Sequence, residues 1–301
     1  MCLRFLNDRA RKRLGSLLLV LACPLAGADP AVLRVCADPN NLPFSNQQGE
    51  GLENRLAELM ARDMGAKLEY TWWSQRRSFI KNSLGANLCD AMMSAPAALD
   101  TVSVTHPYYR STYVFVTRKD RNLQLTSLND PRFEKWRVGV HVVGSDYAPP
   151  TAVLARRGLA SNITGFSLFG GYGEENPPAR LIHAVAAGDV DVAIVWGPFA
   201  GYFARREATP LEIAPVSPAA FLTVPFTFEM SMAVRKGDDK LKTALDRALD
   251  RNCAAVQSIL DRYGVPQLSP QGSPQGSPQG SRGEDKSTCG SPRSWPASWS
   301  H

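Results

Sequence analysis

The sequence contains few of the residue patterns that mark catalytic or metal centres. Only four histidines occur among the 301 residues, and His106, His141 and His183 lack the close spacing of a zinc site. A G-x-S-x-G elbow, a phosphate-binding P-loop and a dinucleotide fingerprint are also missing. We therefore expect a protein that is not an enzyme and that uses neither a metal nor a cofactor.

One acid–base pairing stays open on sequence grounds. Asp38 and His106 would form such a pair if the loops that carry them met, although a plain hydrogen bond is the simpler expectation. Fold class alone does not exclude catalysis, because one fold can carry many activities.

The sequence also lacks a strong charge bias in its main part. The formal net charge is +6, but residues 1–28 hold five basic residues and one acidic residue, so the remainder is close to +2. No basic run or stripe marks a nucleic-acid or membrane surface. We expect neither as a partner.

The N-terminus has the order of a secretory leader. Basic residues precede an apolar run at 14–25, and the small residues Ala26–Ala28 follow it. The run is too short for a permanent membrane anchor, so we expect cleavage after Ala28, no transmembrane segment after processing and a periplasmic protein. Acylation at Cys23 is the alternative.

The C-terminus is poor in residues that build a core. SPQG repeats three times from Ser269 to Gly280, and the rest of 269–301 is also rich in Ser, Pro and Gly. This composition predicts a disordered tail.

Three of the six cysteines fall in the part that we expect to fold. Export permits a disulfide, so Cys36 and Cys89 are predicted either to be bonded to one another or to be buried as thiols. Cys253 lies on the apolar face of the last helix, which favours a core thiol.

Residues 29–117 read as a first α/β unit. Strands are expected at 33–37, 67–73, 89–94 and 111–118, with helices at 52–64 and 76–86. Alternation of strands and helices implies a parallel sheet with right-handed crossovers.

A second unit follows over 118–224. Strands are expected at 136–143, 163–166, 190–196 and 211–216, and helices from 145–158, 178–187 and 198–206. A return strand at 223–235 and one long helix from Asp239 to Gly264 then bring 225–268 back to the first unit. Crossings near 116–120 and 222–228 would act as a hinge between two lobes.

This order resembles the periplasmic solute-binding proteins of the amino-acid type. The matching segments are Leu33–Asp38, His106–Tyr109, Arg137–Val140, Gly188–Val192 and Ala233–Gly237. The resemblance covers roughly residues 31–266. It implies a two-lobed periplasmic binding protein type 2 fold, in which each lobe is a mixed sheet flanked by helices and two crossings form the hinge.

A narrower resemblance rests on Cys36–Asn46, Glu53–Asn54, Tyr70–Trp73 with Gln75–Arg77, and Pro107–Val116. These segments look like the binding-protein-like J component that is encoded beside pyrroloquinoline-quinone methanol dehydrogenases, including the lanthanide-dependent kind. The resemblance implies a periplasmic accessory that assists assembly or activation of the quinoprotein. The Pro/Gln/Gly/Ser tail departs from this pattern.

Amino-acid receptors of this fold hold the ligand carboxylate with an arginine and the ammonium with an aspartate. The stretch Ala97–Asp100 contains no arginine, and Val195–Pro198 contains no acid. The resemblance instead implies a cleft rich in aromatic, amide and arginine side chains. We predict that it is formed by Asp38, Asn40, Asn41, Phe44, Trp72, Trp73, Arg76, Arg77, Ser94, Tyr108, Tyr109, Ser145, Asp146 and Trp196.

Three functions remain open from the sequence. The first is an accessory that contacts a quinoprotein methanol dehydrogenase. The second is the substrate-binding protein of an ABC transporter for a small polar solute that is not a standard amino acid. The third is a cleft enzyme, which the missing motifs disfavour.

Overall fold

The computed structural model describes residues 31–170 and 174–268. The predicted leader, its cleavage site and the Ser/Pro/Gln/Gly tail all lie outside these residues.

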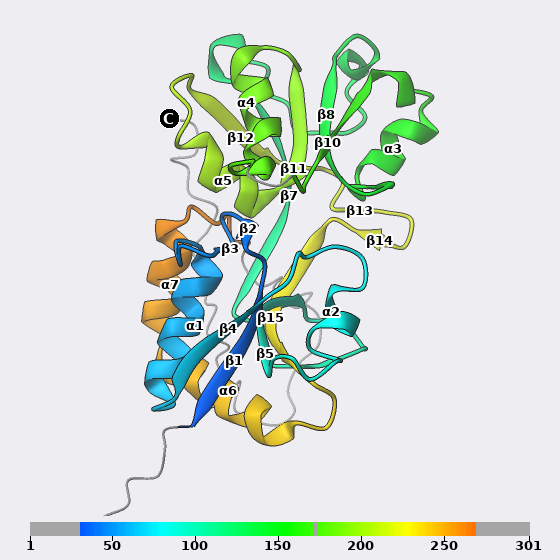
Figure 1. The fold of residues 1–301 in the computed structure, drawn as a ribbon. Coiled ribbons are helices and arrows are strands. Elements are labelled where there is room, and N and C mark those ends of the chain that lie inside the picture. Colours follow the sequence, from blue (N-terminus) through cyan, green and yellow to red (C-terminus); the bar gives the residue numbers. More distant parts are fainter. Residues whose placement is uncertain (1–30, 171–173, 269–301) are drawn as a thin grey trace, which may run out of the picture. The chain divides into compact units, whose positions relative to one another are not determined.

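Helices and short two-stranded hairpins surround one long sheet (Figure 1). The strands are β1 (Val32–Ala37), β2 (Asn40–Asn41), β3 (Ser45–Asn46), β4 (Lys67–Trp72), β5 (Ala91–Pro96), β6 (Ser103–Val104), β7 (Tyr109–Arg118), β8 (Val138–Val143), β9 (Asp146–Tyr147), β10 (Ile163–Ser167), β11 (Val192–Trp196), β12 (Leu211–Pro215), β13 (Ala220–Phe221), β14 (Val224–Pro225) and β15 (Thr227–Val234). The α-helices are α1 (Leu52–Asp63), α2 (Phe79–Asn82), α3 (Thr151–Arg156), α4 (Arg180–Ala187), α5 (Gly197–Ala204), α6 (Asp239–Arg251) and α7 (Cys253–Arg262). Four 3-10 turns, at 119–121, 131–134, 160–162 and 177–179, complete the elements.

The sheet runs in the order β10-β8-β11-β7-β15-β5-β1-β4. β1 pairs in parallel with β4 and β5, and β8 pairs in parallel with β10 and β11. Below, the first unit means β1, β4 and β5 with the loops and helices that follow them, and the second unit means β8, β10 and β11 with theirs. The alternation of strands and helices in the sequence therefore predicted the parallel pairing correctly. Each crossover brings the chain back to the end of the sheet where the previous strand began, so the next strand runs in the same direction.

β7 is the strand that joins the two units. Residues 109–112 pair with β15, and residues 113–118 pair with β11 and β12. The pairing thus changes between Thr112 and Tyr113, a few residues before the predicted crossing near 116–120. The exact lobe boundaries stay a prediction.

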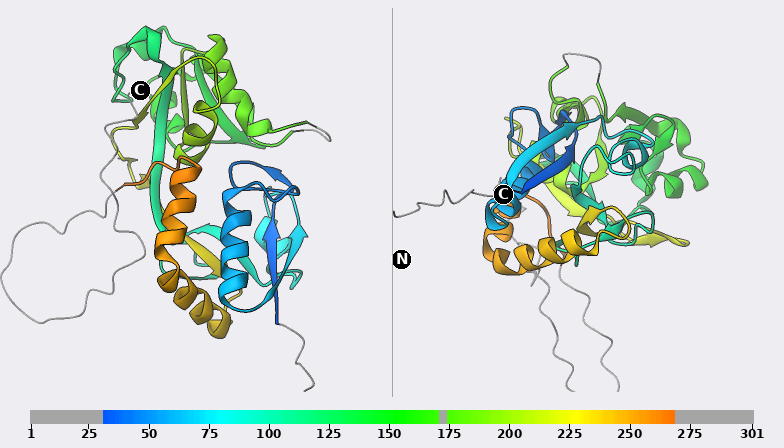
Figure 2. Two further views of the ribbon diagram at one scale, coloured as in Figure 1. Left: turned by 90° about the vertical axis from the view of Figure 1, so that its left-hand side faces the viewer. Right: turned by 60° about the horizontal axis from the view of Figure 1, so that its bottom comes forward.

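α1 shows how the sequence pattern becomes packing. Leu52, Leu56 and Met60 are fully buried on one face, and the helix lies beside α7 (Figures 1 and 2). Its first two peptide N–H groups donate to the carbonyls of Pro43 and Phe44, each at 2.8 Å. The chain stops being helical before Gly65, whose φ of +63° lies in the left-handed region that favours glycine.

Three helix predictions were wrong in extent. The helix expected over 145–158 is limited to α3, because residues 146–147 form β9 instead. A helix was expected over 76–86, but α2 covers only Phe79–Asn82, because Ser78 takes a left-handed conformation with φ 69°. The single helix expected after Asp239 is divided at Asn252 into α6 and α7. The Asn252 amide donates to Asp63 at the end of α1, at 2.7 Å, and to the Ala248 carbonyl. This contact fixes the division.

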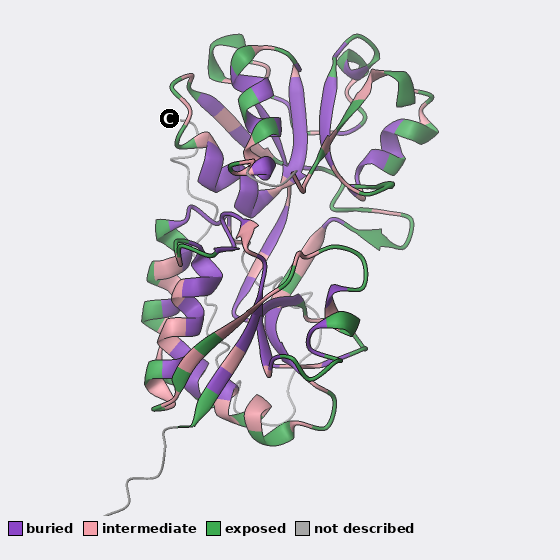
Figure 3. Cartoon of the chain, viewed as in Figure 1, coloured by how far each residue is buried: buried purple, intermediate pink, exposed green. Residues whose placement is uncertain are grey.

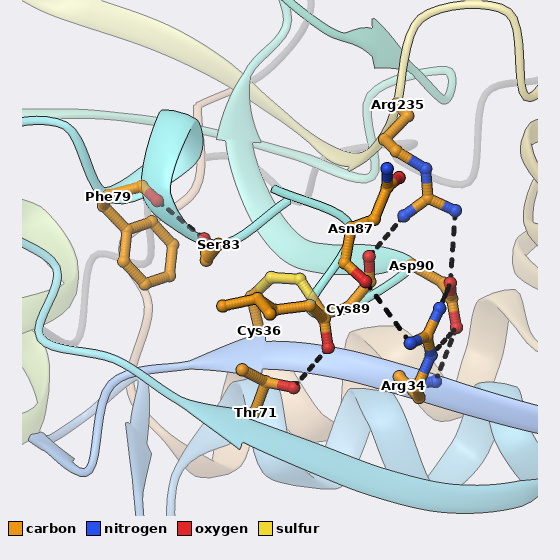
Figure 4. Close-up of a disulfide and its surroundings, with 10 residues drawn as sticks. Arg34, Cys36, Thr71, Phe79, Ser83, Asn87, Cys89, Asp90 and Arg235 are labelled. Atoms are coloured by element: carbon orange, nitrogen blue, oxygen red, sulfur yellow. Dashed lines mark hydrogen bonds and ion pairs between the residues drawn. A yellow bond between two sulfur atoms is a disulfide. The ribbon is translucent and has the colours of Figure 1, made fainter. Parts of the chain in front are cut away.

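A disulfide joins Cys36 to Cys89, with the Cα atoms 5.5 Å apart (Figure 4). One of the two predicted alternatives is therefore correct. Cys89 lies in the segment before β5 rather than in the strand itself. Asp90, next to the bridge, accepts hydrogen bonds from Arg34 at 2.6 Å and Arg235 at 3.2 Å.

The prediction that Cys253 is a core thiol is wrong. Cys253 is only half-buried, and it is itself disulfide-bonded. Periodicity placed it on the apolar face of the helix, but it is the first residue of α7, where the division at Asn252 leaves the side chain near the surface.

Candidate functional site

The candidate site begins where the parallel strands of the first unit end. Ala37 of β1 lies opposite Trp72 of β4, so Asp38 and Trp73 follow their strands at the same edge of the sheet. Val35 lies opposite Ala91, which brings Ser94 of β5 to the same edge. Carboxyl ends of parallel strands are the usual place for a ligand crevice in α/β proteins.

Asp38 holds two loops together at this edge. It is 4% exposed, and its carboxylate accepts hydrogen bonds from the backbone N–H of Asn40 at 2.8 Å and of Gln75 at 2.5 Å. Burial raises the pKa of Asp38, whereas these N–H groups and the nearby Arg76 lower it. The carboxylate is thus a structural acceptor for the loops after β1 and β4.

His106 does not pair with Asp38. Its Nδ1 atom lies 2.9 Å from Asp246 and its Nε2 atom 3.3 Å from Asp250, both on α6. The acid–base pairing left open by the sequence is therefore wrong. Asp38 binds the loops after β1 and β4, whereas His106 lies against α6.

Three predicted residues of the first unit contact the second unit directly. The Asn40 amide donates to the Glu174 carbonyl at 2.7 Å. The Arg76 guanidinium lies 5.5 Å from the centre of the Phe169 ring. Arg77 forms an ion pair with Asp146 at 2.8 Å, although both side chains are mostly exposed. The predicted set therefore brings residues of both units together.

A cavity of about 780 Å³ lies beside these contacts. Its walls come from the loop after β1, the loop after β4 and the segment between β10 and α4. It is lined by Asp38, Pro39, Asn40, Leu42, Asn46, Gln47, Gln48, Glu50, Ser74, Arg76, Phe169, Gly170, Glu174, Glu175 and Asn176. Of the predicted residues, Asp38, Asn40 and Arg76 line it. The run Asn46–Gln48 was missed, although three consecutive amide side chains in a loop were a usable signal.

Aromatic residues of the predicted set fall into two classes. Trp73 is 43% exposed, whereas Trp72 is half-buried and stacks on Tyr70 with ring centres 4.7 Å apart. Phe44 is buried against Phe199 of α5 in an edge-to-face contact at 5.1 Å. Trp72 ends β4 and Trp73 follows it, and the alternation of side chains continues through both residues, which explains why the neighbouring tryptophans differ.

Tyr108 and Tyr109 are core residues rather than surface residues. Tyr108 is fully buried and donates to the Met93 carbonyl at 2.7 Å, and Tyr109 is 3% exposed. Burial raises the pKa of both phenols. Ser94 is also buried, and none of the three is among the cavity-lining residues.

The remaining predicted residues do not line the larger cavity. Asn41 is buried and donates to the Gln75 side chain at 2.9 Å. Ser145 and Asp146 are exposed, Ser145 in the turn after β8 and Asp146 at the start of β9, where it pairs with Arg77. Trp196 is half-buried and makes edge contacts with Tyr113 and Phe228.

Glu53 is a buried acid that the sequence analysis did not select as a site residue. It is 7% exposed at the start of α1, and burial, with a smaller contribution from Asp38, raises its pKa to about 8. Glutamate near a helix N-terminus is common on surfaces, so only tertiary packing distinguishes this one.

A second cavity of about 480 Å³ lies beside the strands that join the units. It is lined by Pro96, Ala97, Ala98, Leu99, Arg110, Pro225, Thr227, Phe228 and Glu229. An arginine from β7 therefore lies beside Ala97–Leu99, although that stretch itself contains none.

Within residues 31–170 and 174–268, no three His, Cys, Asp or Glu side chains gather as a metal site would require.

The profile of the bacterial extracellular solute-binding proteins, family 3, matches residues 33–265. The chain belongs to this family. Protein MoxJ of Methylorubrum extorquens is 32% identical over 259 residues, which span 82% of this chain and 85% of MoxJ.

Two solved structures also resemble this solute-binding protein. The periplasmic binding protein XoxJ from Methylobacterium extorquens AM1 shares 33% identity, with a TM-score of 0.64, and covers 79% of this chain and 100% of XoxJ. MxaJ from Methlophaga aminisulfidivorans MPT shares 27% identity, with a TM-score of 0.67 and coverage of 79% and 100%. The predicted periplasmic binding protein fold and the resemblance to the J components are thereby confirmed.

Membership of an extracellular binding-protein family indicates an exported protein. Among the described residues, every helix is too short or too polar to span a bilayer.

Proposed function

We propose that this protein is a periplasmic accessory of a quinoprotein methanol dehydrogenase and that it assists assembly or activation of the enzyme through direct contact. The proposal is supported by the resemblance to MoxJ, XoxJ and MxaJ over most of the chain. It is also supported by the short segments at Cys36–Asn46 and Pro107–Val116 that resemble the J component.

The observation that carries the proposal is the exposed aromatic and basic group beside the larger cavity. Trp73, Arg76 and Arg77 are all exposed where β4 leaves the sheet. Tryptophan and arginine dominate the binding energy of many protein interfaces, because they combine a large apolar area with directed hydrogen bonds. This group therefore suits a protein partner better than a small solute.

The contacts between the units supply a mechanism. Asn40, Arg76 and Arg77 all contact residues of the second unit through polar or cation–ring interactions at the surface. Such contacts are individually weak, so they can separate and re-form at modest cost. A segment of the dehydrogenase would shift this equilibrium only if it bound one arrangement more tightly than the other.

Deletion in the native host tests the proposal. We expect the dehydrogenase to lose activity or assembly, measured as turnover and as quinone and metal occupancy of the purified enzyme. Normal activity and occupancy, together with no copurification of the two proteins, would contradict it.

Point variants test the surface. Trp73→Ala and Arg76→Ala should each raise the dissociation constant for the dehydrogenase roughly tenfold, which is the effect of losing about 1.4 kcal/mol of binding energy. Copurification should weaken accordingly. Trp196→Ala should also weaken it if the partner reaches between the units. Val32→Ala is a matched control, because Val32 is 46% exposed but lies at the opposite end of β1. An equal loss in Val32→Ala would show that the effect is not local.

A second candidate is a transport receptor for a small polar solute. The 780 Å³ cavity with its amide and acidic walls favours it, since this volume would hold a small molecule. Isothermal titration with the common amino acids should show no tight binding under either proposal. A sub-micromolar dissociation constant for any of them would favour the receptor and show that the charged anchors come from other positions.

A further inference from the structure

Residues 217–225, which form the β13–β14 hairpin and the turn before it, contain no charged side chain; the run reads SPAAFLTVP. Each of these residues is exposed except Phe221, which is half-buried, and the hairpin projects to one side of the sheet (Figure 1). Charged residues are depleted at the cores of protein interfaces. The composition therefore favours a surface that a partner covers over one that faces only water.

Leu222 at the tip of the hairpin is held in an unfavourable conformation. Phe221 pairs with Val224, so Leu222 and Thr223 form a two-residue loop. The φ of Leu222 is +53°, in the left-handed region that a leucine adopts only at an energetic cost, and its side chain is 70% exposed. Glycine or asparagine would fit this turn without strain. Strain of this kind concentrates at functional sites.

The base of the hairpin is anchored in the core of the second unit. Val216 and Phe226 flank the hairpin and are 4% and 0% exposed, and the Phe226 N–H donates to the Ala219 carbonyl at 2.8 Å. Phe221 packs against the same core, and the exposed guanidinium of Arg156 on α3 lies 5.4 Å from its ring centre. The tip is therefore displayed from a fixed base, with a cation beside it.

We propose that the hairpin inserts Leu222 and Val224 into an apolar socket on a folded protein partner, and that this socket carries a carboxylate at its edge. The lack of charge over residues 217–225 matches the apolar socket. Arg156 matches the carboxylate, because an exposed guanidinium at the edge of an apolar contact can form a bidentate pair with it.

A lipid surface fits the hairpin less well. Membrane binding grows with the buried apolar area and with basic residues on the same element, whereas this hairpin exposes two large apolar side chains and has no basic residue. Its position favours the partner of the proposed function. Pro225, Thr227 and Phe228 continue from the hairpin into the wall of the second cavity, beside the strands that join the units. The identity of the partner as the dehydrogenase rests on the proposed function.

Leu222→Asn tests the proposal, because stability and binding should respond in opposite ways. Asparagine tolerates the left-handed region, so the midpoint of chemical unfolding should stay the same or rise. The dissociation constant for the purified dehydrogenase should rise about tenfold or more. Val32→Asn is the control, because Val32 is also exposed but lies at the start of β1, and it should leave the dissociation constant unchanged.

The two proposals fail in different ways. If the wild-type protein and Leu222→Asn bind the dehydrogenase equally well, the hairpin proposal is overturned and the proposed function stands. If the wild-type protein does not bind the dehydrogenase, both are overturned.

Arg156 tests the charge at the edge of the socket. Arg156→Glu should weaken binding more than Arg156→Gln, because the carboxylate of the partner would meet a like charge. Tighter binding by Arg156→Glu would overturn the proposal.

Sedimentation of the protein alone, and with phosphatidylglycerol vesicles, tests the other occupants. We expect neither self-association nor vesicle binding through the hairpin. Either of these, if Leu222→Asn abolished it, would overturn the proposal in favour of a second copy of the chain or a membrane.

Discussion

The loop that leaves β1 and the loop that leaves β8 occupy equivalent places in their units but are held very differently. In the loop after β1, residues 41–46 are all buried, and Asn54 of α1 accepts hydrogen bonds from the backbone of Asn46 and Gly51. In the loop after β8, residues 144–147 are all exposed. The first unit therefore holds its loop by burial and hydrogen bonds, whereas the corresponding loop of the second unit is exposed to solvent.

Figure 3 shows a similar contrast between β2 and β3, which are mostly buried, and the β13–β14 hairpin, which is largely exposed. Leu222 at the tip of that hairpin is 70% exposed and Val224 is 44% exposed. A partner that binds both units would meet a loop fixed by buried contacts on one side and exposed apolar side chains on the other.

The largest effect is expected from substituting Gly51, between β3 and α1, with Gly144 in the loop after β8 as its control. A Cβ at Gly51 would overlap the backbone of Phe44, whereas a Cβ at Gly144 would meet nothing. Gly51→Ala should lower the free energy of unfolding by about 3 kcal/mol or more. Gly144→Ala, the control, should cost only about 1 kcal/mol for its positive φ of 63°. Denaturant unfolding measures both, and equal losses would remove the contrast between the loops.

Asn54→Ala should have the next largest effect. Its side-chain oxygen accepts from the Asn46 N–H at 3.1 Å and the Gly51 N–H at 3.0 Å, and the residue is fully buried. Two buried donors would lose their acceptor, which costs about 2–4 kcal/mol. The lower midpoint of chemical unfolding should be accompanied by faster hydrogen exchange at Asn46 and Gly51. Unchanged exchange at these two amides would show that the loop is held by other contacts.

Glu53→Gln should change how stability depends on pH. The pKa of Glu53 is raised from 4.5 to about 8 in the folded protein, so the folded state binds more protons than the unfolded state between these values. Wild-type stability should therefore fall as the pH rises from about 5 to 8, with a contribution of at most about 1.4 kcal/mol per pH unit. The Gln variant should lack this contribution and gain relative stability as the pH rises. Parallel profiles for the two proteins would contradict the buried carboxyl.

The smallest effect is expected at the surface ion pair between the units. Arg77 and Asp146 are 78% and 62% exposed in their side chains. Breaking the pair by Arg77→Ala or Asp146→Ala should change the free energy of unfolding by about 0.5 kcal/mol or less, because water screens exposed charges. A loss above 2 kcal/mol would mean that the loop after β8 is held as firmly as the loop after β1.

The cysteines show what sequence reasoning missed and why. One of the two alternatives predicted for Cys36 and Cys89 holds, since they are bonded to one another. Cys253 was predicted as a core thiol because one unbroken helix was expected from Asp239 to Gly264, whereas the break at Asn252 makes it the half-buried first residue of α7. Periodicity along an expected helix could not show where tertiary contacts would divide it.

Local patterns in the sequence determined the order of the elements, the parallel groups of strands and the buried face of α1, because periodicity reports which residues of one element face a core. The tertiary structure alone decided which predicted residues reach a cavity. Tyr108 and Tyr109 turned into the core, and Arg110 came to lie beside Ala97–Leu99 from a distant strand. Such outcomes depend on how elements far apart in the sequence pack together, and the pattern within any one element carries no information about its neighbours.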